Sequence, residues 1–218
     1  MLFRSLTVDS GVSATVFGLT LSGGDTKYGG AINNFGTPSV ANAVFSANAA
    51  QWGGAIANNP GAVLQVSNST FTGGFSANGG GGIYNGGGKL SASGDTFSND
   101  HGLFGGGIYN TGVATLSYLT FKGNVAGDGG AISNGSAYNP KGTMTLDHSS
   151  LTQNTADVEG GGIENWGTLT VSDSSIVGNQ AYNLNGGGIE NWGTLTIIAS
   201  TISGNTPDNI SGNPPRYQ

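Results

Sequence analysis

Two acidic residues lie at the same position of a repeated segment, and each is followed two residues later by a tryptophan. An eleven-residue segment containing Gly-Gly-Gly-Ile-Glu-Asn-Trp-Gly occurs twice, so that Glu164 and Trp166 correspond to Glu190 and Trp192. If the copies stack, the two carboxylates repel each other, which raises one pKa or attracts a cation such as Ca²⁺. The paired indoles would also suit stacking against a sugar ring. These four residues are therefore candidate ligands for a glycan or for Ca²⁺.

A simpler interpretation of this pattern is a recent duplication, with the glutamates exposed and the tryptophans covering a turn. In the other repeats the glutamate position holds Asn33, Ala57, Tyr84, Tyr109 and Ser133. Tyr84 and Tyr109 extend the candidate site as an aromatic strip, which favours binding over catalysis. Asp25, Asp128 and Asp157 lie shortly before glycine pairs and are further candidates for Ca²⁺ binding at corners.

The rest of the sequence offers no cluster that predicts catalysis, and we assign no catalytic residue and no metal ligand from it. A polysaccharide lyase needs a Lys or Arg base beside carboxylates, and a glycosidase needs two carboxylates flanking a groove. The interior lysines fall at different positions of their repeats: Lys27, Lys89, Lys122 and Lys141. Because only 8% of the residues are charged, we expect a binding protein without a cofactor other than Ca²⁺.

Two histidines each follow an aspartate, as Asp100-His101 and Asp147-His148. Neighbours along a strand point to opposite faces, so neither pair is expected to form a hydrogen-bonded dyad. The chain has no Cys, and no cluster of His indicates zinc.

Charge and composition exclude further classes of function. The net charge is −6 with six basic residues, whereas nucleic-acid binding needs clustered Lys and Arg. No apolar run approaches the roughly 18 residues of a membrane span. The first residues lead directly into Ser5-Leu6-Thr7-Val8, which reads as a strand, so we expect no signal peptide in this chain and regard it as a piece of a longer protein.

The elements that would position the candidate site are internal repeats. A Gly-Gly-(Gly/Ala)-Ile-x-Asn element recurs with isoleucines at Ile32, Ile56, Ile83, Ile108, Ile132, Ile163 and Ile189. Their spacings are 24, 27, 25, 24, 31 and 26 residues, and the longest reflects an insertion at 136–141 that should protrude as a loop. About 13 residues after each isoleucine comes a large apolar residue that precedes Asn, Asp or Gly by three positions, as in Phe121 and Asn124.

Alternating segments such as Thr168-Leu169-Thr170-Val171 lie between the two elements and predict short strands with one face inward. The pattern predicts an all-β, right-handed parallel β-helix of about eight coils of roughly 25 residues, with three short strands per coil and no helix. We expect a single domain over residues 1–218, with an irregular C-terminal tail at 207–218. Exposed strand edges at the ends of such a stack would permit end-to-end association.

One asparagine follows every isoleucine by two residues: Asn34, Asn58, Asn85, Asn110, Asn134, Asn165 and Asn191. Asn tolerates left-handed corners, and its amide can both donate and accept hydrogen bonds. We predict that these residues form an internal asparagine ladder with a structural role.

The Gly-Gly-Ala-Ile and Phe-x-x-Asn signatures resemble the repeats of polymorphic outer-membrane protein (autotransporter) passengers, within the pectin-lyase-like superfamily. The resemblance covers about residues 15–206. It implies a bacterial extracellular or cell-surface location, and adhesion to a polysaccharide or to a host or neighbouring cell. The leading expectation is therefore a surface-displayed structural and adhesive scaffold. The same superfamily implies an alternative, a polysaccharide-active lyase or hydrolase.

A second alternative comes from threonines on one predicted outward strand. Thr143 and Thr145, Thr168 and Thr170, and Thr194 and Thr196 occupy the same places in three successive coils. Such a two-column grid is similar to the faces of β-helical ice-binding proteins, although Thr is also an ordinary outward β residue.

Overall fold

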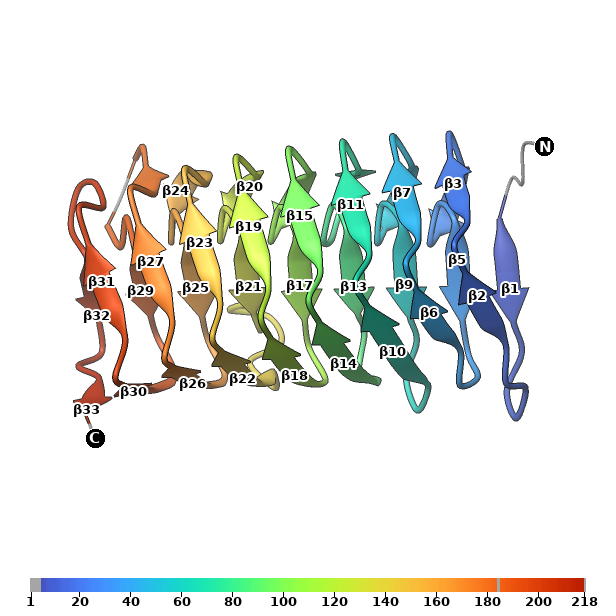
Figure 1. The fold of residues 1–218 in the computed structure, drawn as a ribbon. Helices are drawn as coiled ribbons and strands as arrows, with labels where there is room; N and C mark the ends of the chain where they lie inside the picture. The colour runs from blue at the N-terminus through green and yellow to red at the C-terminus, as the bar shows by residue number, and fades with distance from the viewer. Residues whose placement is uncertain (1–4, 184, 218) are drawn as a thin grey trace.

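A computed structural model of the chain describes residues 5–183 and 185–217. The chain forms a parallel β-solenoid of about eight turns of roughly 26 residues, with no helix in the described residues. Successive turns lie side by side from the N-terminal to the C-terminal end of the stack (Figure 1). Equivalent strands of neighbouring turns pair in parallel and build four sheets, here named A to D. The predicted β-helix is confirmed.

The strands of each sheet follow one another at intervals of one turn. Sheet A consists of β1 (Leu6–Val8), β5 (Ile32–Asn34), β9 (Ile56–Asn58), β13 (Ile83–Asn85), β17 (Ile108–Asn110), β21 (Ile132–Asn134), β25 (Ile163–Asn165), β29 (Ile189–Asn191) and β32 (Ile210–Gly212). Sheet B consists of β2 (Thr15–Phe17), β6 (Ser39–Ala41), β10 (Val63–Ser67), β14 (Lys89–Ser93), β18 (Val113–Ser117), β22 (Thr143–Asp147), β26 (Thr168–Ser172), β30 (Thr194–Ile198) and β33 (Arg216–Tyr217).

The two remaining sheets complete each turn. Sheet C consists of β3 (Thr20–Ser22), β7 (Val44–Ser46), β11 (Thr70–Thr72), β15 (Thr96–Ser98), β19 (Thr120–Lys122), β23 (Ser150–Thr152), β27 (Ser175–Val177) and β31 (Thr201–Ser203). Sheet D consists of β4 (Asp25–Tyr28), β8 (Ala49–Trp52), β12 (Phe75–Ser76), β16 (His101–Phe104), β20 (Val125–Asp128), β24 (Thr155–Glu159) and β28 (Gln180–Ala181).

Sheet D adds a fourth strand to the three that the sequence predicts for each turn. Its segments show no alternation of large apolar residues, and this is why the pattern does not reveal them. Their inward position instead holds small residues, such as Ala50, Ala126 and Ala156, which are buried. The sequence feature that marks sheet D is therefore the small size of its inward residues and not their hydrophobicity.

The core consists of apolar ladders in which each residue contacts its own equivalents. The isoleucines of sheet A pair in register from one turn to the next and are fully buried. In sheet C, the rings of Phe45, Phe71, Phe97 and Phe121 stack at centroid distances of 4.7, 4.5 and 4.8 Å. These distances match the strand spacing of about 4.8 Å, so the ring column follows directly from the parallel register.

The predicted stacking of asparagines is confirmed in sheet A. Each side-chain amide nitrogen donates to the side-chain oxygen of the next asparagine, at 2.7 to 2.8 Å from Asn34 through to Asn191. A second column runs along the corner between sheets C and D. There Asn124 donates to Asn154, and Asn154 donates to Asn179, at 2.9 Å in both cases. Both columns satisfy buried polar groups that water cannot reach.

The C-terminal residues differ from the expected irregular tail. In the described part of that segment, β32 pairs with β29 and β33 pairs with β30, so the chain continues both sheets. Ile210 lies opposite Ile189 and extends the isoleucine ladder, although the Gly-Gly-x-Ile-x-Asn element is absent there. The insertion at 136–141 does protrude, since Tyr138 in it is almost fully exposed. The described residues contain no helix of the length and apolarity needed to cross a membrane.

Candidate functional site

Four of the six predicted site residues share one column on the outer face of sheet A, namely Tyr84, Tyr109, Glu164 and Glu190, and the two tryptophans lie in the turns that follow β25 and β29. In each strand the isoleucine and the asparagine point inward, so the residue between them points outward. The strand pairing aligns these middle residues, which we call the outer column: Asn33, Ala57, Tyr84, Tyr109, Ser133, Glu164, Glu190 and Ser211. We call the part of this column with Tyr84 and Tyr109 the aromatic half and the part with Glu164 and Glu190 the acidic half.

Tyr84 and Tyr109 form the predicted aromatic strip, and further aromatic residues that were not predicted join it. Tyr84 stacks with Tyr109 at 5.5 Å between ring centroids, and side chains at the ends of sheet D strands join them. Trp52 lies 4.9 Å from Tyr84, and Phe104 lies 5.2 Å from Tyr109. Tyr109 is buried, and its hydroxyl lies 3.1 Å from the Ser136 hydroxyl. Most of this half is therefore packed, with little of Tyr109 accessible to a ligand.

In the acidic half, Glu164 lies directly opposite Glu190, as the sequence duplication predicts. The exposure assumed for these glutamates is wrong, because their exposed fractions are 2% and 1%. They are covered from one side by the end of β24 and from the other by the turn that carries the tryptophans. Glu164 contacts the Trp166 indole and the Ser133 hydroxyl, and its carboxylate lies within 4.8 Å of that of Glu159.

Hydrogen bonds tie the tryptophans to the carboxylates. The indole N–H of Trp166 donates to Glu164, and that of Trp192 donates to Oε1 of Glu159 at 3.0 Å. The other oxygen of Glu164, Oε2, lies 2.7 Å from the Ser133 hydroxyl. The two indoles stack at 5.5 Å with an interplanar angle of 24°. The pair is thereby held in a fixed orientation, with Trp192 44% exposed.

The pKa values in the acidic half are raised, mainly because burial disfavours the charged form. Burial, together with the nearby charges of Asp128 and Glu159, raises the pKa of Glu164 to about 8. Burial and the charges of Glu159 and Asp208 raise the pKa of Glu190 to about 7, and burial and Glu159 raise that of Asp128 to about 6. Protonation or a bound cation would relieve this repulsion.

The hydrogen bonds around Ser133 are compatible with a protonated Glu164. The Ser133 hydroxyl lies 2.7 Å from Glu164 Oε2 and 2.8 Å from the Gly135 carbonyl oxygen. A hydroxyl carries one proton and can donate fully to only one of these acceptors. A protonated Glu164 supplies the second proton, whereas an ionised Glu164 competes with Gly135 for the first.

Sequence reasoning identifies Asp128 as a candidate but misses Glu159. One carboxylate oxygen from each of Asp128, Glu159 and Glu164 lies within 4.8 Å of the other two. Asp25 and Asp157 are not part of this group. The signal that could have found Glu159 is its place directly before a glycine pair, the same place that Asp128 has one turn earlier.

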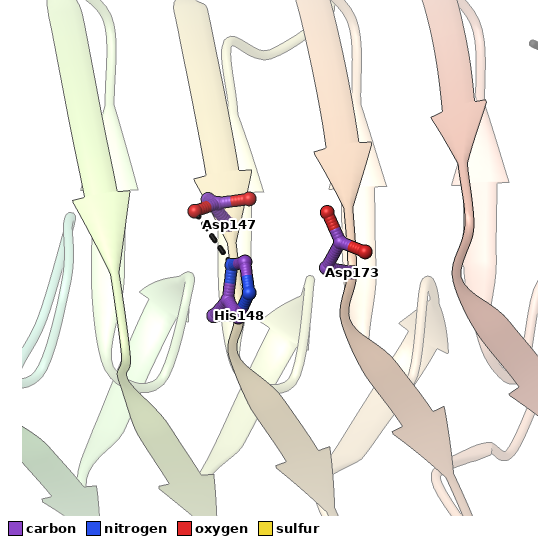
Figure 2. A group of neighbouring side chains, drawn as sticks. All are labelled: Asp147, His148 and Asp173. Atoms are coloured by element: carbon purple, nitrogen blue, oxygen red, sulfur yellow. Dashed lines mark hydrogen bonds and ion pairs between the residues drawn. The ribbon is translucent and has the colours of Figure 1, made fainter.

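A second, exposed group corrects an expectation about histidine. Figure 2 shows Asp147, His148 and Asp173 at the corner between sheets B and C. Nδ1 of His148 lies 2.8 Å from Oδ2 of Asp147, so the pair does form a hydrogen bond, contrary to the prediction from strand alternation. The cause is the backbone: His148 has a φ of 45°, which turns it back toward Asp147. The Ser172 hydroxyl also donates to Asp147, at 2.6 Å.

The threonine grid lies in register on the outer face of sheet B. One column holds Thr143, Thr168 and Thr194, and the other holds Thr115, Thr145, Thr170 and Thr196. Lys89 in the same sheet lies between Val63 and Val113.

The comparisons with known proteins agree with the fold. A family model described as the Chlamydia polymorphic membrane protein repeat matches residues 118–135, which contain one Phe-x-x-Asn and one Gly-Gly-Ala-Ile-x-Asn element. No curated protein and no solved structure matched the chain. The chain is a β-helix repeat protein that resembles polymorphic membrane protein passengers, and these findings fit a surface-associated scaffold.

Proposed function

We propose that this chain is a β-helix scaffold displayed at a bacterial cell surface and that its tryptophan pair contacts glycans in adhesion. The matched repeat supports the location, because its family is described as membrane protein. The solenoid supports the scaffold role, since stacked turns give an extended and rigid surface for display.

The stacked pair of Trp166 and Trp192 carries the glycan proposal. Indole rings bind the apolar faces of sugars well when the rings are held in place and partly exposed. Both N–H groups are engaged by carboxylates, and Trp192 keeps 44% of its surface exposed. Glu159 is half-buried beside this ring and has a second oxygen that a sugar hydroxyl could reach. By contrast, Glu164, Glu190 and Tyr109 are too buried to contact a sugar directly, and Tyr84 is half-buried.

A glycan array tests the proposal. The parent chain is compared with Trp192→Ala and with the double variant Trp166→Ala/Trp192→Ala, each with and without Ca²⁺. Tyr182→Ala is the matched control, since Tyr182 is an exposed aromatic residue outside the outer column. We expect saturable binding to at least one glycan class, lost in both tryptophan variants and kept in the control. Binding that survives loss of both indoles would refute the site.

Ice binding is a second candidate, and the register of the threonine columns on sheet B favours it. Four threonines in one column and three in the other repeat at the strand spacing of about 4.8 Å. Inhibition of ice recrystallisation by the parent chain, lost on replacing Thr145 and Thr170 by lysine, would support it. Equal recrystallisation rates with and without the chain would exclude it.

A further inference from the structure

The three carboxylates beside the tryptophans come from two neighbouring turns and meet at one point. Asp128 ends β20, Glu159 ends β24, and Glu164 lies in the middle of β25. The oxygens that face one another are all within 4.8 Å. Because they belong to three different strands of a rigid stack, their approach is fixed by the fold and not by a flexible loop.

A local departure from the regular repeat creates this meeting point. In the pairing of β20 with β24, Ala126 lies opposite Ala156, but Asp128 lies opposite Glu159. The second strand therefore contains one extra residue, a β-bulge. With regular pairing, Val158 would lie opposite Asp128 and Glu159 would fall one position further along. Bulges of this kind commonly re-aim a side chain beside a functional site.

In the part of the chain that the structure describes, no positive side chain forms an ion pair with these carboxylates. Within residues 5–183 and 185–217, the ion pair found is the one between His148 and Asp147, on another corner of the solenoid. Carboxylates buried without a counter-charge destabilise a fold, so such groups are usually protonated, paired or bound to a metal.

Glu190 provides an independent sign of an absent partner. It stacks on Glu164 in the outer column and is 1% exposed, yet its Oε2 has no hydrogen-bond partner. Glu190 is not one of the three clustered carboxylates, but its pairing with Glu164 places it next to that group. A buried oxygen without a donor, next to three clustered carboxylates, is the environment that a cation completes.

We infer that Asp128, Glu159 and Glu164 bind one Ca²⁺ ion, with Glu190 as an additional carboxylate at its edge. All the donors are oxygens, which suits a hard cation and not zinc or copper. Calcium–oxygen distances of about 2.3–2.6 Å allow ligand oxygens to lie up to about 5 Å apart, and the oxygens here, which lie within 4.8 Å of one another, are compatible with this. Magnesium binds at about 2.0–2.1 Å and demands near-octahedral geometry, which carboxylates fixed on three different strands are less able to provide.

The bound ion would also act on the tryptophans. Trp166 donates to Glu164 and Trp192 donates to Glu159, so both indoles are anchored on proposed ligands. Fixing the two carboxylates therefore fixes the exposed ring of Trp192. The cation site does not require a glycan, so each can be tested without the other.

Titration of the metal-free chain with CaCl₂ alone tests the site. Calorimetry should show saturable binding of one ion, tryptophan fluorescence should change with the same midpoint, and the melting temperature should rise. MgCl₂ should bind at least tenfold more weakly. Glu159→Gln and Asp128→Asn each remove one charge while keeping the shape, and should weaken Ca²⁺ binding at least tenfold. Asp9→Asn, at an exposed acid near the N-terminal end of the stack that belongs to neither group of clustered acidic residues, is the matched control and should bind like the parent.

A folded parent chain that shows no saturable Ca²⁺ binding up to millimolar concentration would overturn the inference. Equal Ca²⁺ affinity in the parent and in both folded charge-removal variants would overturn it as well. Glycan binding that persists in a chelator, with no calcium binding, would reject the cation site and leave the tryptophan platform standing. Calcium binding without glycan binding would support the cation site and reject the tryptophan platform as a glycan site.

Discussion

Asp100 occupies an asparagine position in the column between sheets C and D, and this makes the stability of the chain depend on pH. Its Oδ1 accepts a hydrogen bond from the Gly74 amide at 2.7 Å, while its Oδ2 is buried without a partner. The asparagines in the same column use that second atom as a donor: Asn124 donates to the Phe97 carbonyl at 3.0 Å. An ionised aspartate cannot make this bond. Asp100→Asn should therefore restore the column.

The size of the effect follows from the pKa. Burial raises the pKa of Asp100 from 3.8 to about 8, against weaker opposing hydrogen bonds from the backbone. Between pH 4 and pH 8 the folded chain holds a proton that the unfolded chain has released, so its stability falls as the pH rises. Each unit of pKa is worth about 1.4 kcal/mol, so Asp100 lowers the free energy of unfolding by about 4 kcal/mol at pH 7 and by about 1 kcal/mol at pH 4.5.

Thermal melting of the parent and Asp100→Asn at pH 4.5 and pH 7 measures this difference. For a chain of this size, about 4 kcal/mol corresponds to a melting-temperature gain of about 8–16 °C at pH 7, and the gain should shrink to a few degrees at pH 4.5. Other titrating groups act on both proteins alike and cancel. The reverse change, Asn124→Asp, should introduce a similar pH-dependent loss. A gain that is the same at both pH values would refute the assignment of a buried, protonated Asp100.

Three further outcomes test the packing. Ile108→Asp should lower the melting temperature more than Ile32→Asp, because a charge in the middle of the stack disrupts turns on both sides, and equal losses by calorimetry would contradict this. Phe97→Ala should cost about 3–5 kcal/mol in urea unfolding, since it opens a cavity in the ring column, and a loss below about 1 kcal/mol would mean that the column closes over the gap. Gly106→Ala should prevent a folded circular-dichroism spectrum, because its Cβ would lie 2.3 Å from the Gly130 carbonyl oxygen, and normal folding would contradict that close approach.

The ladders could be predicted from the sequence because a parallel stack places like residues over like residues. Once the isoleucine and asparagine positions repeat at a nearly constant spacing, the contacts of one turn define those of all turns. The alignment of Glu164 over Glu190 follows in the same way, and it is observed.

What departs from the repeat could not be predicted in this way. The burial of Glu164 involves Trp166 and Glu159, which lie close to it in the folded chain, and residue spacing carries no information about these contacts. The position of Glu159 depends on one extra residue in a strand, and the Asp147–His148 bond depends on a positive φ at His148. Functional sites often lie at such irregularities, where local pattern and observed structure disagree.

Asp100 shares a raised pKa with Asp128 and Glu164 of the outer site, but the two places should respond differently to calcium. Asp100 points into the interior, where its neighbours are backbone amides and asparagines, and no second carboxylate is grouped with it among the described residues. Only protonation can then remove the cost of burying the charge of Asp100. A bound cation can also neutralise the repulsion among Asp128, Glu159 and Glu164. Saturating Ca²⁺ should therefore stabilise the parent and Asp100→Asn equally, and melting curves with and without Ca²⁺ measure this. A calcium effect that disappears in Asp100→Asn would place the ion in the interior column and refute the outer site.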